Sequence, residues 1–356
     1  MNGKVRVLHI LSSNRFSGAE NVVCQIIHMF RNDLEYEFVY CSPDGEIRLA
    51  LKERNIKFKS IKKMSISEIK RVIEEINPDI IHAHDMRASF FAALACKKIP
   101  LITHIHNNSY ESRKPTVKSI LYWFAGKKSK HIFWVSKSAY EGYCFHRGIQ
   151  SKSSILYNVI DAEQLIQKAN SAANKEKYDV IYLGRLTYPK NPERVVEVLE
   201  KVKMKYPKLS AAIIGTGELE NEIKEIINLK GMNDNICMCG FMNNPYGILQ
   251  NAKVMLMTSR WEGTPMCALE AMALGIPIVS TPTDGLKEIV DCGKTGYLSD
   301  QNNVLEEKIY ELITNENILS SFRKKCLEKN RMINNSFVYK DRIRKEYDLC
   351  IEVCNK

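Results

Sequence analysis

The sequence contains no apolar run of about eighteen residues, which a helix needs to cross a bilayer, so we expect no membrane span. It also contains no Cys-x-x-Cys pair. Its 11 cysteines are scattered and odd in number, which argues against a secreted disulfide framework and favours a reducing cytoplasm. The first residues, MNGKVRVLHILSS, are basic, but the apolar stretch after them is short and contains His9. This start therefore predicts a buried strand rather than a signal peptide.

The composition is that of an ordinary globular protein, with 356 residues, 45% of them hydrophobic and 26% charged, which is enough for two cores. The net charge of +11 favours anionic partners, namely phosphorylated ligands, an anionic membrane face or nucleic acid. A solvated lysine-rich surface would give the same charge. No basic motif interleaved with aromatic residues stands out, so nucleic acid is not an expected partner.

Apolar, β-branched runs alternate with amphipathic stretches, which is the pattern of a parallel sheet covered by helices on both faces. The rhythm breaks at the polar segment 162–177. We therefore predict two doubly wound α/β domains, at 1–168 and 178–335, and a C-terminal helix at 336–356 that packs back on the first domain. The predicted strands are VRVLHIL (5–11), YEFVYC (36–41), DIIHAH (79–84), PLITHIH (100–106), HIFWVS (131–136), YDVIYLG (178–184), LSAAIIG (209–215), NICMCG (235–240), KVMLMTS (253–259) and IPIVST (276–281).

Ligands of open parallel sheets bind outside the carboxyl ends of the strands, so two such sheets facing each other would enclose a cleft. After the strand ending near Leu183, the segment GRLTYPKNPERVV places Arg185 and Lys190 at a strand-to-helix turn. Asn191 is a candidate N-cap and Pro192 a first-turn proline, so exposed amides would lie beside two cations. Such a turn suits a diphosphate, although two solvated surface cations could have the same spacing.

The next strand is followed by GTGELE, in which Gly215 and Gly217 predict a tight turn beneath a ligand. This lone G-x-G lacks the third glycine of a dinucleotide fingerprint, and no G-x-G-x-x-G follows the first strand either. An NAD-dependent oxidoreductase is therefore the least favoured class of enzyme.

The segment RWEGTPMCALEAMALG, 260–275, places two glutamates on either side of a predicted helix start. Thr264 is the predicted N-cap and Pro265 the first helical residue. The backbone amides of Gly263, Thr264 and Met266 would then open toward a phosphate, whereas Pro265 has no amide hydrogen to donate.

The two glutamates of this segment could both contact a sugar. Glu262 lies in the turn, and Glu270 lies about a turn and a half along the helix, where it could reach a ribose. A carboxylate accepts two hydroxyl hydrogen bonds at once, which suits a vicinal diol. Both could instead be ordinary solvated glutamates. For Glu270 the flanking alanine, leucine and methionine residues favour burial, and a buried carboxylate needs partners.

These motifs resemble those of the retaining glycosyltransferases of family 4, whose GT-B fold consists of two Rossmann-like domains. Residues 260–281 resemble the family's E-x7-E region, and GRLTYPKN resembles its Arg and Lys segment. TDGLKEIVDCGKTGYL resembles its closing segment and FSGAENVV its glycine-rich loop. Ser17 stands where glycine is common in that loop, so a backbone angle that only glycine adopts would be strained there.

The resemblance implies roles for the matching residues. Arg185 and Lys190 would bind the donor diphosphate, and Glu270 the ribose. Glu262 would hold the transferred sugar with the backbone that follows it, and His106 would lie near that sugar. The predicted catalytic residues are thus His106, Arg185, Lys190 and Glu262. The predicted donor-binding residues are Gly18, Arg185, Lys190, Gly215, Glu262, Gly263, Thr264, Pro265, Met266 and Glu270, and the predicted acceptor or sugar contacts are His84 and Asp85.

Two His-x-His pairs, His82 with His84 and His104 with His106, each place both side chains on one face of a strand. Such pairs could bind a metal, but no acidic or cysteine ligand pattern accompanies them, and the sequence has no Asp-x-Asp pair. We therefore predict that no cofactor and no metal is needed. We expect neighbours to hydrogen-bond His82 and His104, and His84 and His106, at the strand ends, to be placed to meet substrate.

The segment 111–131, ESRKPTVKSILYWFAGKKSKH, mixes six lysine or arginine residues with apolar and aromatic ones. Such a segment suits docking on an anionic inner leaflet, and an interior helix with a basic exposed end is an equal alternative. Docking would imply a lipid-linked glycan acceptor of surface polysaccharide assembly. The expected location is the cytoplasm, at the inner face of the membrane if docking occurs.

The predicted function is retaining transfer of a hexose or N-acetylhexosamine from a nucleoside-diphosphate sugar, preferably a UDP-sugar, to a glycan or lipid-linked glycan (EC 2.4.1 type). The resemblance implies a front-face route in which the departing phosphate assists the acceptor hydroxyl. The alternatives are a nucleotide-sugar epimerase of the same fold and an inactive transferase-like partner subunit. The GAE loop and the E-x7-E segment argue against the epimerase. The joint presence of the predicted site cations and glutamates argues against the inactive subunit.

Overall fold

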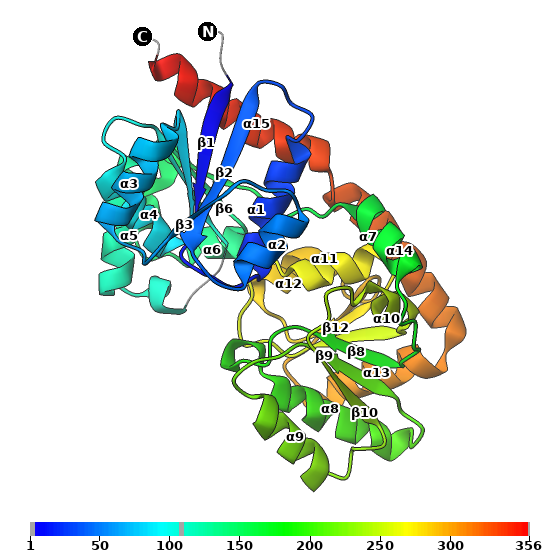
Figure 1. Cartoon of the computed structure of the whole chain (residues 1–356). Coiled ribbons are helices and arrows are strands. Elements are labelled where there is room, and N and C mark those ends of the chain that lie inside the picture. Colours follow the sequence, from blue (N-terminus) through cyan, green and yellow to red (C-terminus); the bar gives the residue numbers. More distant parts are fainter. Residues whose placement is uncertain (1–3, 107–109, 355–356) are drawn as a thin grey trace. The chain divides into compact units, whose positions relative to one another are not determined.

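The computed structural model describes residues 4–106 and 110–354 and divides into two compact units, Met1–Val159 with Ser336–Lys356, and Ile160–Asn335 (Figure 1). The division lies before the predicted boundary at residue 168. Helix α7 (Ala162–Ser171) belongs to the second unit, where it packs on other helices through buried Leu165 and Ala169. The polar composition of this segment hid a helix with a narrow apolar face.

The first unit contains a seven-stranded sheet in which every neighbouring pair is parallel, in the order β3-β2-β1-β4-β5-β6-β7. The central strands β4 and β5 are buried along their whole length, as expected for a sheet covered on both faces. The strands are β1 Val5–Ile10, β2 Tyr36–Pro43, β3 Phe58–Ile61, β4 Ile80–His84, β5 Leu101–Ile105, β6 His131–Trp134 and β7 Ser153–Ile155.

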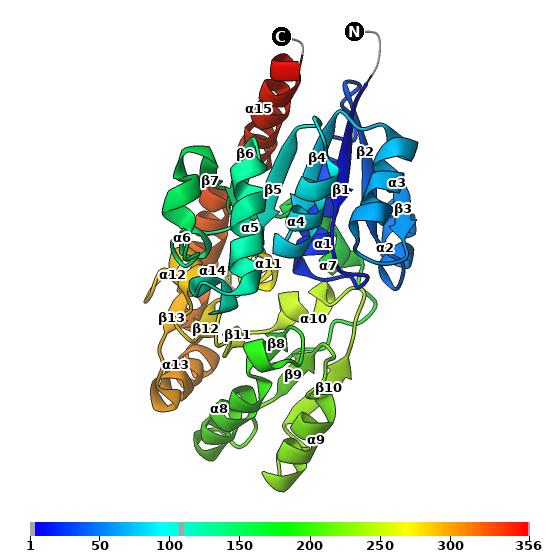
Figure 2. The same ribbon diagram turned by 90° about the vertical axis from the view of Figure 1, so that its left-hand side faces the viewer.

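Helices cover both faces of this sheet: α3, α4 and α5 pack side by side on one face, and α1 packs beside α15 on the other (Figures 1 and 2). Local sequence sets their ends. In α3, for example, the hydroxyl of Ser65 accepts a hydrogen bond from the amide of Glu68, and Asn77 closes the helix in the left-handed conformation. The helices are α1 Gly18–Met29, α2 Ile47–Glu53, α3 Ile66–Ile76, α4 Met86–Ala95, α5 Val117–Lys128, α6 Lys137–Glu141 and α15 Ser336–Cys354.

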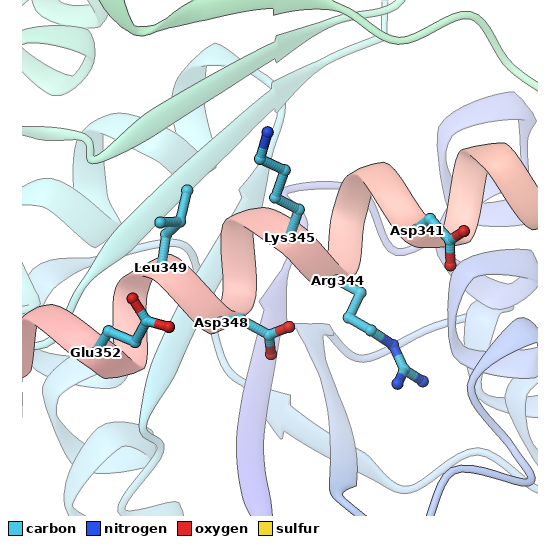
Figure 3. Close-up of a pocket in the computed structure, with 6 residues that line it drawn as sticks. All are labelled: Asp341, Arg344, Lys345, Asp348, Leu349 and Glu352. Atoms are coloured by element: carbon cyan, nitrogen blue, oxygen red, sulfur yellow. The ribbon is translucent and has the colours of Figure 1, made fainter.

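The last helix, α15, is anchored in the first unit by buried aromatic residues. The hydroxyl of Tyr347 lies 2.8 Å from Nδ1 of His82, and the hydroxyl of Tyr36 hydrogen-bonds Asp348. The outer side of α15 is charged. A surface depression there is lined by Asp341, Arg344, Lys345, Asp348, Leu349 and Glu352 (Figure 3). None of the predicted site residues lines this depression.

The second unit contains a six-stranded parallel sheet in the order β10-β9-β8-β11-β12-β13. Helices α9, α8 and α13 pack in a row, and α11 packs on α7 and α14. The strands are β8 Val180–Leu183, β9 Ala211–Ile214, β10 Ile236–Gly240, β11 Val254–Met257, β12 Ile278–Ser280 and β13 Gly296–Leu298. The helices besides α7 are α8 Pro192–Lys205, α9 Glu220–Leu229, α10 Tyr246–Asn251, α11 Met266–Ala273, α12 Asp284–Ile289, α13 Asn302–Thr314 and α14 Glu316–Ile333.

The predicted fold class, two doubly wound parallel sheets, is confirmed, and each of the ten predicted strands is present. Three further strands, β3, β7 and β13, were missed. All three lie at sheet edges, have three or four residues and are mostly half-exposed. An edge strand is solvated on one side, so it lacks the continuous apolar run that marks a central strand.

Candidate functional site

The turn after β8, which carries Lys190, is tied by hydrogen bonds to the turn after β11. Thr258 Oγ1 donates to the main-chain oxygen of Asn191 at 2.8 Å, and the amide of Arg260 donates to the oxygen of Pro189 at 2.8 Å. Strands β8 and β11 are neighbours in the sheet, so both turns lie at its carboxyl edge. The sheet therefore fixes the position of one turn relative to the other.

Lys190 and Glu262 form an ion pair across these two turns, with Nζ of Lys190 2.5 Å from Oε1 of Glu262. The hydroxyl of Ser259 donates to the same carboxylate oxygen at 2.6 Å. Burial alone would lower the pKa of Lys190, but its attraction to Glu262 outweighs burial, and the pKa is raised. Lys190 is therefore a charged, largely buried cation, unlike Arg185, which is exposed.

Glu270 is buried in the middle of α11, as its apolar neighbours predicted, with 8% of its surface exposed. Its Oε1 accepts a hydrogen bond from the hydroxyl of Tyr246 at 3.0 Å. Burial raises the pKa of this carboxyl to about 7, against the lowering effects of Tyr246 and Lys168. The group thus titrates near neutral pH, which is unusual for a glutamate and is typical of functional sites.

Both predicted helix starts lie near the observed ones. Helix α8 begins at Pro192 after Asn191, as predicted, but the side chain of Asn191 makes no capping hydrogen bond. The prediction that Thr264 caps α11 is wrong by one residue, because α11 begins at Met266 and Pro265 is its N-cap. Proline cannot donate, so the first amides of α11 belong to the residues that follow it.

The turns after β8 and β9 touch through their backbones. Gly215 has φ +137°, and a Cβ atom there would lie 1.9 Å from the main-chain oxygen of Gly184. The amide of Leu186 also donates to the oxygen of Thr216 at 2.9 Å. Glycine at position 215 is therefore required by the fold itself, whatever else it contacts.

Gly285, in the first turn of α12, lies against the turn that carries Glu262. A Cβ atom at position 285 would lie 1.2 Å from the main-chain oxygen of Gly263, so the two backbones are in direct contact. The TDGLKE segment was matched only as part of a family region, and this packing role was not predicted.

Replacement of Gly285 by alanine is expected to displace the turn at Gly263, because a backbone oxygen cannot make way as a flexible side chain could. Such overpacking costs roughly 1–3 kcal/mol of unfolding free energy. Urea unfolding of Gly285→Ala measures this cost. Gly18→Ala is the matched control, since a Cβ there meets nothing within 4 Å. An unfolding midpoint equal to that of the wild type would contradict the close contact.

In the first unit, the glycine-rich loop leads into α1, which begins at Gly18. The expectation of strain at Ser17 is wrong: its φ of −146° and ψ of −163° are extended angles that any residue adopts. The Ser17 hydroxyl donates to Oε2 of buried Glu20 at 2.5 Å. Serine is therefore compatible with this loop and stabilises it through a side-chain contact.

His84 and His106 lie together at the carboxyl edge of the first sheet, with Nδ1 of His84 2.9 Å from Nε2 of His106. His84 is fully buried and His106 is partly buried. The expectation that His84 is placed to meet substrate directly is therefore wrong in this structure. His106 is the outer ring of the pair, and the rest of its motif, at residues 107–108, lies outside the described residues.

Asp85 and His104 have different surroundings from those expected. Asp85 caps α4: its carboxylate accepts hydrogen bonds from the amide of Ala88 at 2.8 Å and the hydroxyl of Ser12 at 2.6 Å. His82 is hydrogen-bonded to Tyr347, as predicted for a neighbour-satisfied histidine. For His104 the same prediction is wrong, because it is fully buried and neither ring nitrogen has a partner among the described residues.

The histidines also form two groups whose candidate ligand atoms lie within 4.8 Å of one another: His9 with His82 and His84, and His84 with His104 and His106. Imidazole nitrogens are common ligands of transition metals. No carboxylate or cysteine joins either group among the described residues. That the protein needs no metal stays a prediction.

Helix α5 exposes most of the apolar side chains of segment 111–131. Its buried face is made by Tyr122 and Ala125, whereas Val117, Ile120, Leu121, Trp123 and Phe124 are exposed. The segment's six lysine and arginine side chains are exposed as well. The alternative of an interior helix is therefore wrong. In the part of the chain that the structure describes, no helix is long and apolar enough to cross a bilayer.

Two doubly wound sheets, with a buried lysine–glutamate pair and a second buried glutamate at the carboxyl edge of one of them, define a nucleotide-sugar-dependent type of transferase. Two family models match the chain: Glycosyltransferase Family 4 over residues 16–164, and Glycosyl transferases group 1 over residues 163–332. Together they span nearly the whole chain. The protein belongs to this family of GT-B glycosyltransferases.

Curated relatives come from bacteria and archaea. The chain is 25% identical to the UDP-Gal:alpha-D-GlcNAc-diphosphoundecaprenol alpha-1,3-galactosyltransferase of Escherichia coli, covering 100% of this chain and 99% of that protein. It is 25% identical to the capsular polysaccharide biosynthesis glycosyltransferase CapH of Staphylococcus aureus, covering 75% of this chain and 78% of that protein. An uncharacterized glycosyltransferase of Methanocaldococcus jannaschii is 28% identical, but the match spans only 58% of that protein and 60% of this chain.

Solved structures show the same fold. Anabaena HepE in complex with UDP and glucose has a TM-score of 0.84 at 17% identity, over 97% of this chain and 99% of that chain. Staphylococcus aureus TarM in complex with UDP has a TM-score of 0.79 at 12% identity, over 96% of this chain and 99% of that chain.

Proposed function

We propose that the protein is a retaining hexosyltransferase (EC 2.4.1 type) that moves a hexose or N-acetylhexosamine from a UDP-sugar to a glycan or lipid-linked glycan in surface polysaccharide biosynthesis. The observation that carries this proposal is the buried Lys190–Glu262 pair beside the N-terminus of α11, with Glu270 further along the same helix. The named activity of the Escherichia coli relative and the UDP bound in two structural neighbours support uridine as the base.

In the proposed mechanism, cations and backbone dipoles stabilise the departing diphosphate. An ammonium group has three donors, so Lys190 can keep its bond to Glu262 and donate to a phosphate oxygen as well. Arg185 and the first amides of α11 add donors at the same place. The transfer needs no metal because these groups offset the negative charge that builds up on the phosphate.

The carboxylates and His106 orient the sugar. Glu270 accepts hydrogen bonds from the two ribose hydroxyls, and Glu262 contacts the transferred sugar while holding Lys190. His106, with Gly18, contacts the donor from the first unit. No side chain is assigned as a covalent nucleophile, so the departing phosphate takes the proton of the acceptor hydroxyl on the same face of the sugar.

Incubation of the protein with a UDP-sugar, a diphosphoundecaprenol-linked sugar and EDTA tests this function. The proposal expects UDP release that depends on the acceptor, and a product whose new linkage has the anomeric configuration of the donor, measured by NMR. Acceptor-independent conversion of the sugar would instead support the epimerase. A folded protein that neither binds nor converts any UDP-, GDP- or ADP-sugar would support the inactive subunit.

Gly18→Ala is expected to leave stability unchanged and to weaken donor use. The structure gives position 18 no steric need for glycine, because an added Cβ meets nothing within 4 Å. If a bound donor lies against this backbone, a methyl group there should raise the donor KM by about tenfold, which corresponds to a loss of roughly 1.4 kcal/mol. Steady-state kinetics and thermal unfolding measure the two effects. Unchanged KM would remove Gly18 from the donor site.

We further propose that α5 docks on an anionic membrane at the cytoplasmic face, which would bring the enzyme to a lipid-linked acceptor. Exposed Trp123 and Phe124 beside exposed lysines combine apolar contact with charge attraction. The Trp123→Ser/Phe124→Ser variant is expected to partition about tenfold less onto phosphatidylglycerol vesicles in a sedimentation assay.

Leu229→Ser, which removes an 85%-exposed apolar side chain on α9, is the matched control and should bind vesicles like the wild type. Equal binding to phosphatidylcholine and phosphatidylglycerol vesicles, or equal binding by the double variant, would contradict docking through α5.

A further inference from the structure

Three histidines of the first unit form a chain of hydrogen bonds. Nδ1 of His9, on β1, lies 2.8 Å from Nε2 of His84, on β4, and Nδ1 of His84 lies 2.9 Å from Nε2 of His106, just after β5. In both pairs the ring centroids are 5.1 Å apart, with interplanar angles of 26° and 17°. The rings therefore meet edge to edge through their nitrogens.

The two remaining histidines of the cluster meet this chain differently. His82 stacks on His84 with ring centroids 4.2 Å apart, and His104 lies over His106 with centroids 4.0 Å apart. Neither donates to or accepts from the chain. The cluster thus separates into three rings joined by hydrogen bonds and two that only pack against them.

The three chain rings are neutral at neutral pH. Burial lowers the pKa of His9 and of His106 to about 3, and it lowers the pKa of His84 well below its usual range. A neutral imidazole carries one proton, so one nitrogen donates and the other accepts. Each hydrogen bond in the chain must therefore point the same way, and only two arrangements of the protons exist.

The ends of the chain decide between these arrangements. Among the described residues, Nε2 of His9 has no hydrogen-bond partner, and it is fully buried. An orphaned buried N–H group is rarer in proteins than an orphaned acceptor. The proton of His9 then lies on Nδ1, His84 donates from Nδ1, and His106 accepts at Nε2.

We propose that His9 and His84 are positioning residues that hold His106 in the tautomer with its proton on Nδ1, so that His106 offers a neutral N–H donor to an oxygen of the transferred sugar. The proposal deepens the proposed function and rests on it for the identity of the ligand. The tautomer itself is a property of the donor-free protein.

Nitrogen-15 NMR of the full-length, histidine-labelled protein without donor tests the tautomer directly. We expect the wild type to show His106 protonated at Nδ1 and unprotonated at Nε2. His84→Phe removes the donor to His106 and should give a mixture of tautomers, whereas His9→Phe, which keeps the His84–His106 bond, should give a smaller change. His104→Phe is the matched control, since it alters a ring packed on His106 and breaks no hydrogen bond.

The kinetic consequence is a rise of about tenfold in donor KM for His84→Phe, as expected for one lost hydrogen bond, and little change for His104→Phe. Protonation of His106 at Nε2 in the wild type would overturn the proposal without any variant. An equal effect of His104→Phe would also overturn it, as would Zn²⁺ bound by these ring nitrogens in the purified protein. If the tautomers behave as expected but no nucleotide sugar binds, the proposed function fails and the hydrogen-bonded chain stands.

Discussion

Lys190→Met is expected to lower kcat/KM for the UDP-sugar by about 10²- to 10³-fold, which is the usual cost of removing one preorganised group from a developing charge. It is also expected to lower the unfolding free energy by about 3 kcal/mol. The reason is that Glu262, 8% exposed and 2.5 Å from the lysine, would become a buried carboxylate without its cation. Steady-state kinetics and urea unfolding measure the two effects.

Two further variants separate catalysis from stability. Lys253→Met breaks a comparable pair in the same unit, where Lys253 lies 2.9 Å from Asp179, and it should lose stability while keeping kcat/KM. Lys190→Met combined with Glu262→Gln should regain stability, because no charge remains buried, but not activity. A Lys190→Met enzyme with wild-type kcat/KM would contradict the assignment of this lysine to the diphosphate.

Glu270→Gln is expected to stabilise the protein at pH 8 and to weaken donor binding. The pKa of this carboxyl is raised from 4.5 to about 7, so between these values the folded state keeps a proton that the unfolded state has lost. Stability therefore falls as pH rises from about 4.5 to 7 and stays low above it. The shift corresponds to about 3 kcal/mol, which glutamine would restore at pH 8 and not at pH 4.5.

Urea unfolding of wild type and Glu270→Gln at pH 4.5, 6 and 8 measures this difference. Tyr246→Phe is the informative companion, because the Tyr246 hydroxyl lowers the pKa of Glu270, and its loss should extend the unstable range to higher pH. Parallel pH dependences in wild type and Glu270→Gln would show that the carboxyl is not held neutral by burial. The expected gain in stability with loss of donor affinity is the trade-off typical of a functional group in an apolar place.

The sequence predicted the central strands well because each is buried on both faces and therefore nearly all apolar. Edge strands such as β7, with Ser153 and Ser154, gave no such signal. Helix α7 was hidden for a related reason, since only Leu165 and Ala169 of its ten residues are buried. Local composition reports burial, and where burial is partial it reports little.

The predicted site residues of the second unit are brought together at the carboxyl edge of one sheet, but their partners could not be predicted. Ser259 and Tyr246 are ordinary residues in the sequence, and only the fold places their hydroxyls on Glu262 and Glu270. Gly285 likewise depends on a backbone contact with Gly263 across two loops. Contacts between segments far apart in the chain leave no local pattern.

In the first unit, the spacing of the histidine pairs correctly placed two rings on each strand face, but it could not show which rings bond to one another. That depends on the register of β1, β4 and β5, which sets His9 opposite His82 and His84 opposite His104. His9 was seen only as an interruption of an apolar run. It lies at the inner end of the hydrogen-bonded chain to His106.

Calorimetric titration of UDP into the wild type and Glu270→Gln, at pH 8 in EDTA, is the most direct test of a metal-independent nucleotide-sugar site in the second unit. We predict saturable binding of one UDP per chain to the wild type, and an affinity at least about tenfold lower in the variant, because a charge-assisted hydrogen bond contributes roughly 1.5–3 kcal/mol. GDP and ADP should bind more weakly than UDP. Equal UDP affinity in the two folded proteins, or no binding to the wild type without a divalent metal, would contradict this site.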